Sequence, residues 1–499
     1  MKQPYYSRSV VPRVSIAMAM TMVLGLAGCA DFSGIHTRAH MIQSRSLAGI
    51  GPNHSSPGVF PQQHWWMAFG DAQLDGLIAR AITANPSLKV AQSRVVEAQA
   101  SAAAIDSARY PQINGEAKST RERLSANSLY PPPLGGSMVT MNSANLTGQW
   151  QLDLFGKNRA ALDAAIGQSR AAEADAQAAR VLLAANVAQQ YFNLARLQAQ
   201  QDLDRAMLRQ REQTQELVRQ RVAAGLDNTL AQRQAQAEVP QIRRDMAALD
   251  EQVALARHGL AVLMGAEPNA TDTLVAHLPT ATLPRMPGHL PAELLGHRAD
   301  VVAARWRVES ELQGIQETKA EFYPNINLSA FIGFESIGLS KWLSAGSRTF
   351  GVGPALSLPI FDEGVLRAKL QGNTARADVA IDNYNAAVLN ALRDVADQLS
   401  SWRALQTQLQ EQMAAQAAVS SAYDLALARY QGGLTNYLNV LTAENAVLQQ
   451  RHTLIDLQAR VYDLDVGLMR ALGGGYVITD GPRQLSNTTE TRTAPGIQG

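Results

Sequence analysis

Cys29 is the residue whose type and position most clearly indicate chemistry. It is the only cysteine in the chain, so it cannot form an intrachain disulfide. It follows Leu-Ala-Gly at residues 26–28, which end a short apolar run that starts near residue 15. Basic residues, a short apolar run and small residues in that order are the pattern of a secretory signal peptide. The sequence therefore predicts that residues 1–28 are a lipoprotein-type signal peptide and that the thiol lies at the cleavage point.

The surroundings of Cys29 resemble the bacterial lipobox, in which the thiol receives diacylglycerol and the cysteine becomes the mature N-terminus. The resemblance implies a covalent diacylglycerol and an N-acyl lipid on Cys29, and no other cofactor. Ala30 follows, where an aspartate would favour the inner membrane in enteric bacteria, so we expect the outer membrane. Residues 29–62 show no sustained period and are expected to form an extended tether. The alternative is an ordinary signal peptide with an incidental cysteine.

Other reactive residue types lack the spacing that an enzyme or a metal site needs. The nine histidines are scattered and no cysteine cluster is present. His36 and His40 form one His-x-x-x-His pair, but it lies in the expected extended tether, where this spacing does not place both rings on one face of a helix. No phosphate-binding Gly-x-x-x-x-Gly-Lys-Ser/Thr loop occurs, and the glycines at 473–475 are better interpreted as the end of a helix. The net charge is +1 without a basic block. We therefore expect no catalytic residue, no metal and no nucleic-acid partner.

The chain contains an internal repeat, so the elements that could position a site occur twice. Arg-x-x-x-Gly-Leu-x-Asn-x-Leu at residues 221–230 returns at residues 429–438, roughly 210 residues later. Tyr-Pro-x-Ile at 110–113 returns at 323–326 in the same order. Matching signals in matching order indicate two copies of one unit. We expect structural repeat 1 over 63–292, structural repeat 2 over 293–480, and a disordered tail over 481–499.

Each copy is predicted to contain a short helix followed by two strands. Tyr110-Pro111 and Tyr323-Pro324 are the expected helix-to-strand turns, because proline disfavours the helical conformation at the residue before it. After each turn the hydrophobic period changes from about 3.6 to 2. The expected strands are about 113–124 and 142–154 in repeat 1, and about 326–335 and 349–360 in repeat 2. The first is assigned by its place in the repeat, because its own alternation is poor.

A long helical hairpin follows the strands of each copy. No proline interrupts residues 151–239 or 360–481, and Ala, Gln, Leu and Arg dominate there, as in long helices and coiled coils. The tips are expected at Gly225 and Gly433, where glycine can adopt the left-handed conformation that ends a helix. Asp227 and Thr435 are the expected N-caps of the returning helices. Pro240 is expected to kink the first of these.

The predicted fold class is mixed and mainly α. No stretch after the signal peptide approaches the roughly 20 apolar residues of a membrane helix, so a membrane would have to be crossed by strands in a closed barrel. Four strands from one protomer cannot close a barrel, which needs about eight. Three protomers would supply twelve. We therefore expect an internally duplicated protomer that forms a trimeric 12-stranded transmembrane β-barrel, continuous with a long periplasmic α-helical barrel.

Several motifs in this order resemble the outer membrane factors, the trimeric channel-tunnels of tripartite efflux pumps, in their lipoprotein branch. They are Trp66-x-x-Phe69-Gly70-Asp71, Tyr110-Pro111-Gln112-Ile113, Trp150-x-Leu152-Asp153-Leu154-Phe155-Gly156, Phe322-Tyr323-Pro324 and Arg429-Tyr430-x-x-Gly433. Arg298-x-Asp300 also fits, with Ala299 where the family usually has proline. The resemblance implies a homotrimer in the outer membrane lipid and no enzyme activity. It implies a passive, gated conduit that exports drugs and toxic compounds received from a periplasmic adaptor and an inner-membrane pump of the RND, MFS or ABC type.

The resemblance also implies roles for residues of the hairpins. The tips at Gly225, Leu226, Gly433 and Leu434 would dock the adaptor, although the glycines can equally be plain turn residues. The constriction would include Leu438, where relatives place an apolar ring, and Thr442, where relatives often have an aspartate that favours cations. Arg429 and Tyr430 resemble residues that hold neighbouring hairpins together; the alternative is a surface arginine and a packing tyrosine. These residues complete the predicted site.

Two other functions stay open at this point. An outer membrane channel for type I protein secretion would use the same elements for a different cargo. A lipid-anchored periplasmic coiled-coil scaffold would explain Cys29 and the helices, but not four strands placed symmetrically in two repeats.

Overall fold

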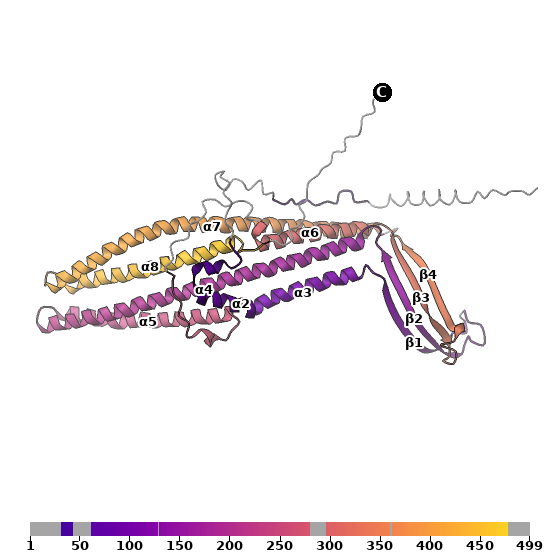
Figure 1. Ribbon diagram of the computed structural model, residues 1–499, viewed down its shortest axis with the longest axis horizontal. Coiled ribbons are helices and arrows are strands. Elements are labelled where there is room, and N and C mark those ends of the chain that lie inside the picture. Colours follow the sequence, from indigo (N-terminus) through magenta and orange to yellow (C-terminus); the bar gives the residue numbers. More distant parts are fainter. Residues whose placement is uncertain (1–30, 43–60, 128, 280–295, 360–361, 478–499) are drawn as a thin grey trace, which may run out of the picture. The chain divides into compact units, whose positions relative to one another are not determined.

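The computed structural model describes residues 31–42, 61–127, 129–279, 296–359 and 362–477 (Figure 1). Cys29, the predicted signal peptide and the predicted tail over 481–499 lie outside these residues. Among the helices of the described part, none is long and apolar enough to cross a membrane.

The two copies contain the same elements in the same order. The first comprises α3 (Pro86–Ser107), β1 (Gln112–Arg123), β2 (Met138–Leu152), α4 (Lys157–Ala223) and α5 (Thr229–Leu263). The second comprises α6 (Ala299–Ala320), β3 (Asn325–Ile337), β4 (Arg348–Ser357), α7 (Glu363–Gln431) and α8 (Tyr437–Ala471). Shorter elements are η2 (Trp65–Phe69), α2 (Ala72–Ala84), η3 (Pro268–Thr271) and η5 (Ala345–Ser347). The predicted fold class, mixed and mainly helical with an internal duplication, is confirmed.

Two strand bounds differ from the sequence expectation. β2 begins at Met138 rather than near residue 142, because residues 138–141 pair with the last residues of β1. β4 ends at Ser357 rather than near residue 360. Pro359 lies just beyond and has no N–H for a ladder, which explains the earlier end.

The N-caps of the returning helices lie one residue later than the sequence predicts. Asn228 caps α5 by accepting a hydrogen bond from the Ala231 N–H at 2.9 Å, and Asn436 caps α8 in the same way. Both residues have an extended backbone directly before the first helical residue, as an N-cap requires. Asp227 and Thr435 therefore do not cap. α5 also continues on both sides of Pro240.

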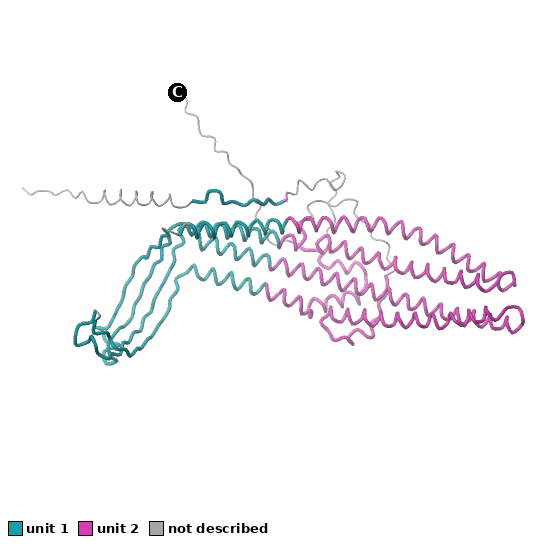
Figure 2. Tube along the Cα trace, turned by 180° about the vertical axis from the view of Figure 1, so that it is seen from behind, with its two compact units in different colours: residues 1–41, 95–171, 304–384 teal, residues 42–94, 172–303, 385–499 magenta. Residues whose placement is uncertain are grey.

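The chain forms two compact units that do not coincide with the two repeats, because each unit takes segments from both copies. Unit 1 contains residues 1–41, 95–171 and 304–384, and unit 2 contains residues 42–94, 172–303 and 385–499 (Figure 2).

Unit 1 contains one antiparallel sheet in the order β1-β2-β3-β4, so the two copies meet where β2 pairs with β3. Directly opposite residues share a face of the sheet. Leu146 lies opposite Ile332, which lies opposite Phe350, and their side chains are 55%, 62% and 80% exposed. The same face carries Ile113, Trp150, Val352 and Leu356. The opposite face is mostly polar. Unit 1 therefore presents a broad apolar face that is exposed among the described residues of the unit.

Residues 31–41 of the predicted tether are bound along α7 in unit 1. Asp31 forms an ion pair with Arg367 at 2.7 Å, and the Phe32 ring packs edge-on against Phe322 with centroids 5.0 Å apart. Asp378 accepts hydrogen bonds from the backbone N–H groups of residues 38 and 39. Side-chain contacts thus hold this extended segment, which follows the predicted lipid site directly.

Unit 2 holds the main hydrophobic core. Tyr191 and Phe192 of α4 are fully buried there, and Phe192 stacks on Tyr462 of α8 with centroids 4.8 Å apart. The Tyr191 hydroxyl donates to Asp71 at 2.5 Å, which ties the start of α2 to α4. The paired long helices of unit 2 are therefore joined to each other before they reach their tips.

Candidate functional site at the hairpin tips

The two hairpins turn with the same geometry, and both tips belong to unit 2. Gly225 and Gly433 have φ of 71° and 73°, the left-handed region that side chains other than glycine rarely adopt. The N–H of Leu226 donates to Arg221 O at 2.8 Å, and the N–H of Leu434 donates to Arg429 O at the same distance. These bonds close the last turn of each long helix.

The leucine after each glycine points into solvent. Leu226 is 66% exposed and Leu434 is 75% exposed, in a protein whose other large apolar tip residues are mostly packed. An exposed leucine directly after the turn glycine is therefore a feature of both tips.

Tyr430 links the two hairpins just behind the tips. Its side chain is buried, and its hydroxyl donates to the Asp227 carboxylate at 2.6 Å. The Arg221 guanidinium lies over the Tyr430 ring at 4.6 Å and donates to the backbone carbonyl of Gln431. Burial and the Asp227 carboxylate both raise the pKa of Tyr430, so the phenol stays protonated as a donor. These contacts join the first hairpin to the second.

The remaining predicted constriction residues lie on exposed surface. Leu438 is 51% exposed, and the Thr442 hydroxyl donates to the Leu438 carbonyl at 2.9 Å within α8. The two side chains are one helical turn apart and share a face. The Arg429 side chain is exposed and forms no hydrogen bond or ion pair with the described residues. Of the predicted pair, only Tyr430 therefore takes part in an inter-hairpin contact within this chain.

A charged cluster is buried one to two turns further from the tips. Arg211 of α4 forms an ion pair with Glu238 of α5 at 2.7 Å and donates to Asn445 of α8 at 2.6 Å. Glu444 is fully buried beside them, and neither carboxylate oxygen has a hydrogen-bond partner among the described residues. Burial, with a smaller contribution from Glu238, raises the pKa of Glu444 to about 6, although Arg211 opposes the shift.

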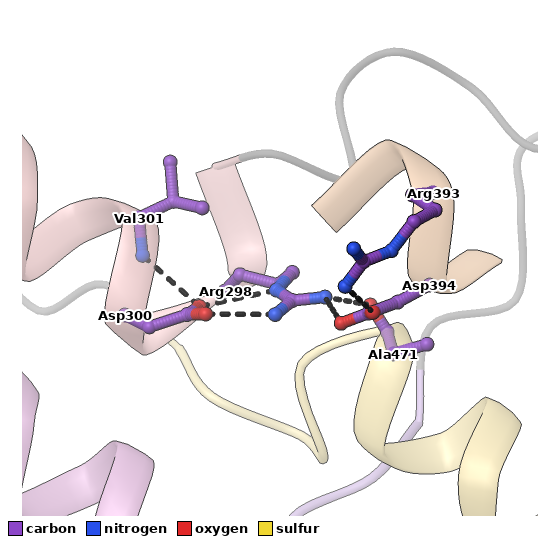
Figure 3. Close-up of polar contacts among 6 residues, drawn as sticks. All are labelled: Arg298, Asp300, Val301, Arg393, Asp394 and Ala471. Atoms are coloured by element: carbon purple, nitrogen blue, oxygen red, sulfur yellow. Dashed lines mark hydrogen bonds and ion pairs between the residues drawn. The ribbon is translucent and has the colours of Figure 1, made fainter. Parts of the chain in front are cut away.

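Arg298 joins three elements at the start of α6 (Figure 3). Its guanidinium donates to Asp300 at 2.7 Å and 3.1 Å, and to Asp394 of α7 at 3.1 Å. It also reaches the Ala471 carbonyl at the end of α8. Burial alone would raise the pKa of Asp300, but the two bonds from Arg298 outweigh it and the pKa is lowered. The planar guanidinium thus binds both carboxylates and fixes α6 to α7 and α8.

The predicted helix-to-strand turns lie in unit 1, whereas the tip residues belong to unit 2. Tyr110 and Pro111 stand between α3 and β1, and Tyr323 and Pro324 stand between α6 and β3. The Tyr323 ring stacks on Phe155 with centroids 4.9 Å apart. No group of three or more potential metal ligands gathers in the part of the chain that the structure describes.

The arrangement is that of a known family. The model of the family described as outer membrane efflux protein matches residues 77–266 and 290–474. The chain belongs to the outer membrane efflux proteins. This outer membrane efflux protein is 32% identical over 481 residues to the multidrug resistance outer membrane protein MdtP of Escherichia coli strain K12, covering 93% of this chain and 96% of MdtP. It is 36% identical over 371 residues to the fusaric acid resistance protein FusA of Burkholderia cepacia, covering 73% and 70%.

A solved structure gives the same result. The outer membrane protein VceC of Vibrio cholerae superposes with a TM-score of 0.79 at 36% identity, covering 84% of this chain and all of VceC. The chain is therefore an outer membrane channel protein of efflux, and its family carries out transport rather than catalysis.

Sequence reasoning missed three residues of this efflux protein's tip region: Asp227 as the partner of Tyr430, Arg221, and the buried Glu444. A signal for the first was present. Asp227 and Thr435 occupy equivalent places in the two copies, as do Val222 and Tyr430. The inter-hairpin bond uses two of the five tip positions at which the copies differ.

Proposed function

We propose that this outer membrane efflux protein is a gated conduit that passes small toxic molecules from a periplasmic adaptor and an inner-membrane pump to the cell exterior. The observation that carries the proposal is the sheet of unit 1. Its β1 and β4 each pair on one side only among the described strands, and one face is apolar and exposed. Such edges need strands from further protomers, and such a face needs a lipid environment.

Three protomers would close a barrel of twelve strands, and their hairpins would line a helical tube on the periplasmic side. The exposed Leu226 and Leu434 would then contact the adaptor at the tube's end. Relatives named for multidrug and fusaric acid resistance favour small-molecule cargo over secreted protein.

The proposed gate is the inter-hairpin bond between Tyr430 and Asp227, with Leu438 and Thr442 on the helix that would move. In a planar bilayer, wild type is expected to give small, rarely open currents. Tyr430→Phe, Asp227→Asn and Leu438→Ala are each expected to raise the conductance, because each removes a contact or a side chain from the closed end. Tyr384→Phe, a half-buried tyrosine of α7 outside the tip region, is the control.

Equal currents in wild type and all variants would support the conduit but contradict the assignment of the gate to these residues. No current from protein that is demonstrably inserted would favour the lipid-anchored scaffold instead.

We also propose that Cys29 carries the lipid. The bound segment at residues 31–41 supports this, since it would fix the acyl chains beside unit 1. Incorporation of labelled palmitate into wild type but not into Cys29→Ser is the expected result; labelling of both would place the lipid elsewhere.

A further inference from the structure

The apolar face of the sheet ends in cations at one end only. Following β2 from Leu152 to Ala144, the residues of this face have apolar neighbours in β3, from Ile326 to Phe334. At about 3.3 Å per residue this apolar band is roughly 26 Å long. A lipid-facing band of a membrane sheet is about 25 Å tall. Strands of such sheets are tilted by about 35–45°, so the band spans roughly 20 Å of membrane thickness, close to this height.

Three arginines stand where the band ends, on the side of the strand-connecting loops. Arg348 of β4 lies opposite Phe334, in the last row of the band. In β1, Ala117 occupies that row, and Arg121 and Arg123 follow on the same face because alternate residues share a face. We name these three residues the arginine rim.

The arginine rim has no anionic partner among the residues that the structure describes. All three side chains are exposed, and none forms an ion pair with the described residues. Within the described part of the chain, their one side-chain hydrogen bond is that of Arg123 Nε to the carbonyl of Gly136. The acidic residues at this end, Glu116, Glu122 and Glu335, lie on the other face of the sheet.

Within the four strands, the opposite end of the band carries no lysine or arginine on either face. The strand residues there, such as Leu152, Ile326 and Leu356, are apolar. The asymmetry therefore distinguishes the two sides of a bilayer. Guanidinium groups bind phosphate through paired hydrogen bonds, and arginines at the edge of a hydrocarbon layer extend toward the headgroups.

We propose that Arg121, Arg123 and Arg348 bind the phosphate groups of anionic lipid in the bilayer leaflet on the loop side, which is the surface-facing leaflet. This inference rests on the proposed function, in which the sheet spans the outer membrane. β1 and β4 are the two outer strands of the sheet. Pairing between protomers would therefore place Arg348 of one protomer on the strand next to the β1 arginines of another. A phosphorylated lipid then bridges two subunits and strengthens their association.

The test uses full-length protein reconstituted in phosphatidylcholine nanodiscs with increasing amounts of lipid A. The variant replaces all three arginines by glutamine. The matched control is Lys118→Gln, which removes an exposed cation from the same strand on the opposite face. The measured quantities are the association of spin-labelled lipid A relative to spin-labelled phosphatidylcholine, and the temperature at which the oligomer dissociates.

Wild type and Lys118→Gln are expected to prefer lipid A and to dissociate at higher temperature when it is present. The triple variant is expected to lose at least about fivefold of this preference, since each cation near an anionic surface contributes about that factor. It should also lose most of the thermal gain. Equal preference in the triple variant and wild type would overturn the proposal.

Two further outcomes are decisive. If millimolar inorganic phosphate abolishes the preference, the arginine rim binds free phosphate rather than lipid, and the proposal is wrong. If wild type inserts but shows no preference, the inference fails while the conduit stands; if wild type does not insert, both fail.

Discussion

At the scale of single residues, the charges buried near the hairpin tips make the stability depend on pH. Arg211 has two carboxylates within its cluster, but its ion pair is with Glu238 of the same hairpin, and Glu444 of the second hairpin is left without a hydrogen-bond partner. A buried carboxylate in that state costs free energy unless it takes up a proton. The packing of the second hairpin on the first therefore depends on the protonation of Glu444.

The sign of this dependence follows from the pKa. Burial raises the pKa of Glu444 to about 6 from the ordinary 4.5, so between these values the folded protein holds a proton that the unfolded chain releases. The free energy of unfolding accordingly falls as pH rises through this window and stays lower above it.

Glu444→Gln is therefore expected to stabilise the protein at pH 8 by up to about 2 kcal/mol relative to wild type, and to have little effect at pH 5. Thermal unfolding at the two pH values measures the difference. Glu411→Gln, on the exposed surface of α7, is the control and should show no such pH dependence. An equal effect of Glu444→Gln at both pH values would contradict the assignment.

At the scale of elements, Arg298 is the contact that fixes where α6 begins. Its guanidinium is mostly buried and is shared between Asp300 and Asp394, so truncation would leave two carboxylates without their cation. Such losses typically cost 3–5 kcal/mol when the pair is fully buried. Part of the Asp300 side chain is exposed, which reduces the cost.

Arg298→Ala is expected to destabilise unit 2 by about 2–4 kcal/mol, measured by urea unfolding. Arg298→Lys should recover less than half of this, because an ammonium cannot reach both carboxylates as a planar fork does. Arg393→Ala is the matched control, since Arg393 contacts Asp394 only at 3.6 Å and is largely exposed. A control as destabilised as Arg298→Ala would contradict the role of the fork.

The elements themselves were largely predictable, because the signals for them are local. Gly225 and Gly433 mark turns by backbone conformation alone, and Tyr-Pro marks the end of each short helix. The strand β1 was hard to recognise for a physical reason that the register reveals. Its outward positions begin with Ile113 and Ala117 but continue as Arg121, so its apolar alternation fades where the band ends.

Contacts between the copies were not predictable in the same way. The bond from Tyr430 to Asp227 joins residues about 200 positions apart, and no local pattern specifies which side chains meet at such a separation. The two possible caps at 227 and 228 were likewise chosen by backbone geometry rather than by residue type, because aspartate and asparagine cap equally well.

At the scale of the whole molecule, the number of protomers follows from the sheet. One protomer supplies four strands, and two protomers would supply eight, a barrel whose interior is filled by side chains. A conduit needs a wider lumen, so three protomers are the smallest assembly that can form one. In such an assembly β4 of one protomer pairs with β1 of the next.

This pairing can be tested with cysteines in a Cys29→Ser background, which contains no other thiol. Ile113→Cys in β1 is combined with Phe350→Cys, Val352→Cys or Leu356→Cys in β4. Within one chain β1 and β4 are separated by two strands, about 14 Å, and a disulfide cannot span that distance. Any disulfide between these two cysteines must therefore join two different protomers. At least one combination is expected to give a ladder that ends at three chains on a denaturing gel. A ladder ending at two, or continuing beyond three, would contradict the closed trimer.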